Sequence, residues 1–224
     1  MNDFTYADTS SWEPWQLEYE HGAFYIFPPT GVIEAIDALR ETYDPKSASY
    51  CQAHISLSEP VSHPLTEAEL EELQTKLSTL EPFDVHYGPV RGFSPYPGVA
   101  YAIAPEDTCR QLRSAIHHTS LFRDVPLSRE HIAPHMTIAE FMSVERTEEL
   151  VRQLKGHVPE GKFLCASIEY AVPNNDFYFE RVLTIALRAS IRVASAPSPS
   201  GPRLDTPNIR NQEITPGRVA PPPR

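Results

Sequence analysis

The 224-residue chain is poor in cysteine and glycine, and each shortage excludes classes of protein. Its three cysteines, Cys51, Cys109 and Cys165, are an odd number without a Cys-x-x-Cys pair, which argues against a disulfide framework and fits a reducing, cytoplasmic setting. The nine glycines form no glycine-rich phosphate loop, dinucleotide-binding fingerprint or Gly-x-Ser-x-Gly elbow. We find no signal peptide and no apolar run long enough to cross a membrane, so we expect no membrane partner.

Positive charge is also scarce. Lysine and arginine number 19 against 30 aspartates and glutamates, which gives a formal net charge of −11. The segment from Ile191 onward holds five arginines against Asp205 and Glu213, so residues 1–190 have a formal net charge of about −14. A surface this acidic repels polyanions, and we therefore expect no extended duplex nucleic acid as a partner.

Two short segments repeat one pattern, in which a histidine, an apolar residue, a hydroxyl residue and an apolar residue follow one another. They are His54-Ile55-Ser56-Leu57 and His135-Met136-Thr137-Ile138. Because residues i and i+2 of a strand point the same way, each segment predicts a strand with an imidazole and a hydroxyl on one face. Two such pairs facing one site would supply two proton-transfer groups and two hydroxyl donors, which is what cutting a phosphodiester without a metal requires.

The spacing alone does not establish a site, since nine histidines give some matches by chance and the chain has four. The other two, His117 with Thr119 and His118 with Ser120, follow a segment that reads as an amphipathic helix. On a helix, residues i and i+2 do not face each other, so we expect surface histidines near a helix C-terminus. Taken singly, each motif histidine also fits a structural role, hydrogen-bonded at a sheet edge.

Composition divides the chain into three parts. We expect an N-terminal extension over residues 1–18, one domain over residues 19–190 and a tail over residues 191–224. The tail is rich in proline, has few apolar side chains and ends in Pro221-Pro222-Pro223-Arg224, which predicts disorder. The domain is long enough to bury a core of its own, and we expect a monomer.

Within the domain, a set of elements occurs twice in the same order, as strand, helix, motif strand, helix and strand. The first set comprises the strand Gly22 to Phe27, a helix over Val32 to Thr42 ended by Pro45, the His54 strand, a helix opened by the capping box Thr66 to Glu69, and the strand Phe83 to Val90. The second comprises the strand Val99 to Ile103, a helix with Pro105 near its first turn, the His135 strand, a helix around Glu148 to Leu154, and two strands, Phe163 to Val172 and Phe177 to Leu187.

This order predicts an α+β fold with two lobes related by an approximate twofold axis. Two mainly antiparallel sheets would flank a central cleft, with helices outside and the two motif strands lining the cleft. Residues Asn174 to Asp176 read as a hairpin turn between the last two strands.

With these residues in view, the chain resembles the two-histidine phosphoesterase superfamily, which includes the 2'-5' RNA ligase family and cyclic nucleotide phosphodiesterases. The family signature is two copies of His, apolar, Ser or Thr, apolar, and both tetrads of this chain match it fully. Further features in similar places are Pro134, the Tyr25 and Phe27 strand, Phe93 and the strand that begins at Phe177. The resemblance covers about residues 20 to 190.

The resemblance implies a metal-independent phosphodiesterase that hydrolyses a 2',3'-cyclic phosphate or a similar small diester. His54 and His135 would be the general base and general acid, and Ser56 and Thr137 would donate hydrogen bonds to the phosphate oxygens. The acidity of the chain favours a small nucleotide or a short RNA end as substrate. RNA 2'-5' ligase activity and a non-catalytic nucleotide-binding module remain as alternatives.

Other residues complete the expectations. Phe93, Tyr96 and Tyr178 are candidates for stacking on a base, although packing explains each of them as well. Three residues before His54, Cys51 falls on the opposite strand face, which favours a packed thiol over a nucleophile. Neither a cofactor nor a metal site is expected, because Pro134 breaks any helix that would pair His131 with the motif histidine.

Overall fold

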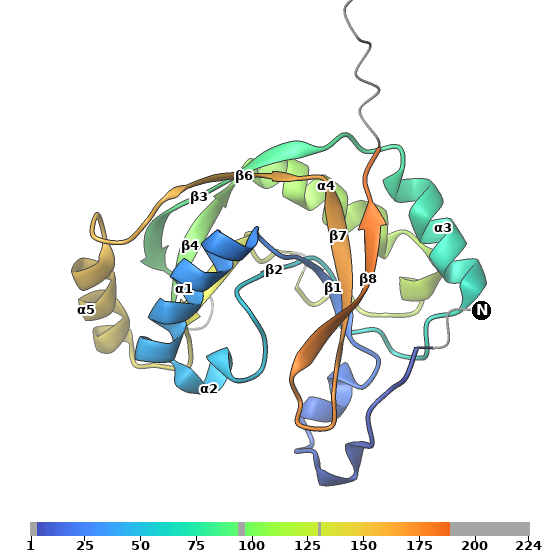
Figure 1. Ribbon diagram of the computed structural model, residues 1–224, viewed down its shortest axis with the longest axis horizontal. Coiled ribbons are helices and arrows are strands. Elements are labelled where there is room, and N and C mark those ends of the chain that lie inside the picture. The colour runs from blue at the N-terminus through green and yellow to red at the C-terminus, as the bar shows by residue number, and fades with distance from the viewer. Residues whose placement is uncertain (1–3, 94–96, 130, 189–224) are drawn as a thin grey trace, which may run out of the picture. The chain divides into compact units, whose positions relative to one another are not determined.

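Two four-stranded antiparallel sheets and five α-helices make up the fold in the computed structural model, which describes residues 4–93, 97–129 and 131–188 (Figure 1). The first sheet has the order β2-β1-β7-β8, with β1 at Ala23–Ile26, β2 at Ile55–Ser56, β7 at Ser167–Pro173 and β8 at Phe179–Ala186. The second has the order β5-β4-β3-β6, with β3 at Phe83–Gly92, β4 at Val99–Ala104, β5 at His135–Ala139 and β6 at Gly161–Cys165. The predicted α+β class with two antiparallel sheets is confirmed.

The helices connect the strands much as the sequence predicts. They are α1 at Thr30–Tyr43, α2 at Pro45–Ala48, α3 at Glu67–Leu77, α4 at Glu106–His117 and α5 at Val144–Leu154. The capping box is present, since Thr66 accepts a hydrogen bond from the backbone N–H of Glu69 and the Glu69 carboxylate accepts one from the N–H of Thr66. Helix α1 contacts β5 and α5 contacts β3 and β4, whereas α3 contacts β8 and α4 contacts β4.

Both motif strands occupy sheet edges. In each sheet the motif strand pairs with the strand that precedes it in its own half of the sequence, β2 with β1 and β5 with β4. The next strand in each sheet comes from the other half of the sequence: β7 pairs with β1 in the first sheet, and β3 pairs with β4 in the second. The two halves of the sequence therefore exchange strands, which holds the two sheets together as one fold.

The predicted strand from Phe163 to Val172 is in fact two strands. Cys165 pairs with Phe83 in the second sheet, whereas Ser167 pairs with Ala186 in the first. The chain thus changes sheets at Ala166. Its apolar alternation continues through the change because both strands bury one face, and alternation does not reveal which partner a strand has.

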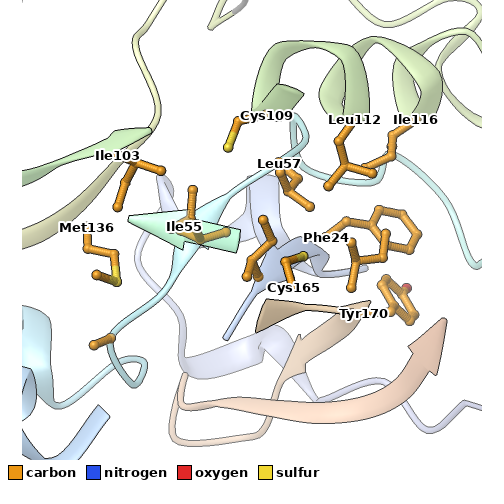
Figure 2. Close-up of a cluster of buried hydrophobic side chains, with 14 of the residues drawn as sticks. Phe24, Ile55, Leu57, Ile103, Cys109, Leu112, Ile116, Met136, Cys165 and Tyr170 are labelled. Carbon is orange, nitrogen blue, oxygen red and sulfur yellow. The ribbon is translucent and has the colours of Figure 1, made fainter. Parts of the chain in front are cut away.

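One apolar cluster connects the two sheets behind the motif strands. Ile55 of β2 and Met136 of β5 are both completely buried, and Figure 2 shows them in the same cluster as Leu112 and Ile116 of α4. Burying a side chain of this size stabilises the fold by about 1.5–3 kcal/mol. The residue after each motif histidine therefore anchors its strand in the core.

The N-terminal residues that the structure describes pack against the β7–β8 hairpin. The rings of Trp12 and Trp15 lie 5.0 and 5.1 Å from that of Phe177, and both meet it edge to face. Phe4 meets Tyr170 in the same way at 5.4 Å. Phe177 belongs to a second cluster, on the side of the first sheet that carries Tyr25, whereas Phe4 and Tyr170 belong to the main core.

The chain divides into two compact units, Met1–Ser190 and Ile191–Arg224. The second unit, and with it the predicted disorder of the tail, lies outside the described residues. Among the helices of the described part, none combines the length and the apolar character that spanning a membrane requires.

Candidate active site

The two motifs lie on neighbouring sheet edges with their polar side chains on the accessible face. Strands β2 and β5 contact each other. His54 and Ser56 are half-buried, as are His135 and Thr137, whereas the apolar residues between them are fully buried. The burial alternates as the tetrads predict, because each strand has the apolar core on one side only.

Both histidine rings are held in the same way. Nδ1 of His54 lies 2.7 Å from the carbonyl oxygen of Gln52, and Nδ1 of His135 lies 2.9 Å from that of Ala133. A carbonyl oxygen only accepts, so each Nδ1 must carry the proton and donate it. This fixes the tautomer and leaves each neutral ring with an Nε2 lone pair able to take a proton.

Neither histidine keeps the ordinary pKa of an imidazole, which is near 6.5. Burial lowers the pKa of His54 to about 4, and the positive charges of Arg40 and His135 act in the same direction. Burial likewise lowers the pKa of His135 to about 4, assisted by Arg113 and Arg91. At neutral pH both rings are therefore neutral, and each feels the positive charges gathered around the site.

Aromatic rings flank both histidines. The ring centroid of Phe93 lies 3.9 Å from that of His135, with the two planes inclined by 37°. On the other side, Tyr25 meets His54 edge to face at 4.7 Å and Phe27 lies 5.9 Å away. These contacts limit the rotation of each imidazole.

The three predicted substrate-binding aromatics fare differently. Phe93 lies at the site, against His135. Tyr96 lies outside the described residues. Tyr178 is half-buried in the hairpin between β7 and β8 and is near enough to Asp37 and Arg40 to feel their charges, which places it on the His54 side.

Two buried arginines support the motif strands, and sequence reasoning missed both. Nη1 of Arg113, on α4, donates to the carbonyl oxygens of Arg129 and Ile132 at 3.1 and 2.8 Å. Its Nη2 donates to the carbonyl oxygen of Ser56 at 3.2 Å. Arg113 therefore ties β2 to the segment that leads into β5.

Arg40 has the corresponding position beside His54. Its guanidinium pairs with Asp37 at 2.9 Å and donates to the carbonyl oxygen of Ser47 at 2.9 Å. The same Asp37 oxygen accepts the backbone N–H of Ala53, the residue before His54, at 2.9 Å. A long charged side chain on an amphipathic helix is usually a surface residue, so no sequence signal distinguishes these two arginines from the others.

We expect Arg113→Met to lower the free energy of unfolding by about 1–3 kcal/mol, because buried carbonyl oxygens lose their donor while most of the volume remains. Urea denaturation followed by circular dichroism measures this. The matched control is Arg110→Met on the same helix, a half-buried residue paired with Glu106 one turn away, where we expect less than about 1 kcal/mol. Equal losses in the two variants would contradict the role given to Arg113.

His117 and His118 were both predicted to be surface histidines near a helix C-terminus, and this is correct for one of them only. His118 is exposed at the end of α4, as expected. His117 is buried at 6% exposure, and its Nε2 accepts a hydrogen bond from the backbone N–H of Glu59 at 3.2 Å. It follows Ile116 on the buried side of α4, against Phe122, so core packing rather than the helix end decides its environment.

The remaining reactive groups near the site are shielded. Cys51 is buried, which raises the pKa of its thiol to about 12 and fits the predicted packed role, although it precedes β2 and packs in the cluster that holds Tyr25 rather than on the opposite face of a strand. Glu140 follows β5 and accepts a hydrogen bond from the hydroxyl of Ser47 at 3.2 Å, and burial raises the pKa of this carboxyl group. In the part of the chain that the structure describes, no three His, Cys, Asp or Glu side chains are grouped so that they would hold a metal ion.

Comparison with known proteins gives a family match. The model of the 2'-5' RNA ligase superfamily matches residues 28–176. A Bacillus cereus (strain B4264) protein named "Putative phosphoesterase" is 29% identical over 133 residues, which cover 58% of this chain and 75% of that protein. A protein of the same name from Bacillus thuringiensis (strain Al Hakam) is 28% identical over 133 residues, with the same coverage.

Solved structures with a similar arrangement include Escherichia coli LigT in its apo form, with a TM-score of 0.49 and 12% identity over 75% of this chain and 96% of that one. Another is TT0787 of Thermus thermophilus, with a TM-score of 0.45 and 16% identity over 75% of this chain and 98% of that one.

Proposed function

The chain belongs to the 2'-5' RNA ligase superfamily, and from this membership we propose that it is a phosphodiesterase that hydrolyses a 2',3'-cyclic phosphate on a small nucleotide or a short RNA end. One observation carries the proposal. Two imidazoles on neighbouring strands are both held by Nδ1, so that both Nε2 atoms are available for proton transfer, and each has a hydroxyl residue two positions further along. A protein that only binds a phosphate has no need of two proton carriers.

The reaction follows from this arrangement. One neutral histidine takes a proton from water through Nε2 while the water oxygen forms a bond to phosphorus. The other histidine, protonated on Nε2, gives its proton to the ribose oxygen as the bond from phosphorus to that oxygen breaks. The product is a phosphomonoester with a free ribose hydroxyl, and the two histidines end with their protonation states exchanged.

The hydroxyls of Ser56 and Thr137 would stabilise the charge that grows on the non-bridging phosphate oxygens. We expect Ser56→Ala and Thr137→Val each to reduce kcat/KM by roughly ten- to a hundredfold, since a hydrogen bond to a charged group contributes about 1.5–3 kcal/mol. Thr137→Ser, which keeps the hydroxyl, is the matched control and should retain most of the activity. Equal loss in Thr137→Ser and Thr137→Val would contradict a role for the hydroxyl alone, because serine keeps the hydroxyl and valine keeps the methyl group.

The direct experiment incubates the purified protein, with a chelator present, with 2',3'-cyclic mononucleotides and with short oligonucleotides that end in a cyclic phosphate. We expect hydrolysis that survives chelation, and chromatography of the products shows which bond is cut. Joining of the cyclic end to an added 5'-hydroxyl oligonucleotide would instead support ligation. Binding without turnover would support a nucleotide-binding module and overturn the proposal.

A further inference from the structure

Strand β3 directs an arginine toward the histidine site. Arg91 pairs with Ala100 of β4, and Ala100 pairs with Thr137 of β5. Residues directly opposite each other in antiparallel strands share a face, so Arg91, Ala100 and Thr137 lie in one row on the face that carries His135. The residue between the arginine and the threonine is Ala100, which is buried and has only a methyl group as its side chain.

Phe93 supports the same orientation. It follows Arg91 by two positions along the end of β3, and its backbone N–H continues the hairpin by donating to the carbonyl oxygen of Gly98 at 2.7 Å. Positions i and i+2 of an extended chain point the same way, and the ring of Phe93 lies against that of His135 with their centroids 3.9 Å apart. The end of β3 thus presents an aromatic ring and a guanidinium on one side, and the charge of Arg91 is felt at His135.

The position of Arg91 decides what it can bind. Two strand spacings, about 10 Å, separate its backbone from that of Thr137. A phosphate held between the two motifs would therefore lie beyond the row, and the exposed guanidinium of Arg91 would stand beside that phosphate rather than on it. Guanidinium groups bind phosphate through charge-assisted, often paired hydrogen bonds.

We propose that Arg91 binds a second phosphate of the substrate, next to the one that reacts, so that the preferred substrate is a nucleotide with a 5'-phosphate or a short oligonucleotide rather than a nucleoside cyclic phosphate alone. The inference rests on the proposed function for the identity of the reacting group. It also accounts for nucleotide recognition by an acidic chain, since attraction at one arginine on the site acts locally despite the net charge.

The test compares two substrates that differ by one phosphate, adenosine 2',3'-cyclic phosphate with and without a 5'-phosphate. In the wild type we expect kcat/KM to be roughly ten- to a hundredfold higher for the 5'-phosphorylated form. Arg91→Gln should bring this ratio close to one. Arg123→Gln removes the same charge from an exposed position and should leave the ratio as in the wild type.

Two outcomes would overturn the inference, a wild-type ratio near one and a ratio that Arg91→Gln leaves unchanged. If Arg91→Gln slows both substrates by the same factor, the ratio is unchanged, and Arg91 would then act only on the reacting phosphate or on His135. Calorimetry with adenosine 2'-phosphate and adenosine 2',5'-bisphosphate gives the same ratio without turnover. If the wild type hydrolyses neither substrate but binds the 5'-phosphorylated ligand more tightly in an Arg91-dependent way, the proposed function alone is overturned. If the wild type hydrolyses both substrates with equal kcat/KM, this inference alone is overturned.

Discussion

Replacing either His54 or His135 by alanine is expected to reduce kcat/KM for a 2',3'-cyclic nucleotide by about a hundredfold to ten-thousandfold. Each imidazole transfers one of the two protons, and the Nδ1 hydrogen bond to a backbone carbonyl holds the transferring Nε2 in place. Because the two rings act in one proton-transfer cycle, the double variant should lose little more than the poorer single variant. Steady-state hydrolysis of the cyclic nucleotide measures all three.

The control is His118→Ala. His118 has the same spacing to a hydroxyl residue, Ser120, but it is exposed at the end of α4 and its Nδ1 bonds to the carbonyl oxygen of Ser114. We expect unchanged kcat/KM in this variant. Activity that survives in His54→Ala or His135→Ala at more than about a tenth of the wild-type value would contradict a role in proton transfer.

Local sequence signals predicted the elements of the fold and not their partners. The capping box at Thr66 located the start of α3 because it satisfies backbone donors within one turn. The alternation around His54 and His135 predicted which side chains face the core, since the strand period is fixed. The exchange of β3 and β7 between the two halves depends on long-range pairing, and neither strand carries a local signal of its partner.

The site shows the same division. The four candidate residues of the two motifs stand out in the sequence because each histidine lies two positions before its hydroxyl residue. Arg113 could not, because its role comes from reaching the carbonyl oxygen of Ser56, 57 positions away. Arg91 could not either, since its relation to Thr137 exists only in the register of three strands. The environment of the histidines, and with it their acidity, follows from such distant contacts.

The pH dependence of hydrolysis is expected to be displaced toward acid. Burial lowers the pKa of both His54 and His135 to about 4, with Arg40 acting on the first and Arg113 and Arg91 on the second. The reaction needs one protonated and one neutral ring, and kcat/KM reports the protonation of the free protein. Above pH 4, the fraction of free protein in which one of the two histidines is protonated falls tenfold with each pH unit. We therefore expect kcat/KM to fall about a hundredfold from pH 5 to pH 7. A stopped assay of initial rates across this range measures the slope.

The apparent pKa in the pH profile of kcat should be higher than that in the profile of kcat/KM, because the bound phosphate is an anion and favours the protonated imidazole. Removing a positive charge acts in the same direction, so Arg91→Gln should move the falling limb of kcat/KM to higher pH, whereas Arg123→Gln should not. An unchanged falling limb of the kcat/KM profile in Arg91→Gln, or a wild-type kcat/KM that is flat or rises from pH 5 to pH 7, would contradict this account.

The activity profile is measured only in the pH range where circular dichroism shows folded protein. Because the folded-state pKa of each histidine lies below the unfolded value near 6.5, the unfolded chain takes up protons first, and stability is lost progressively as the pH falls from about 6.5 to 4.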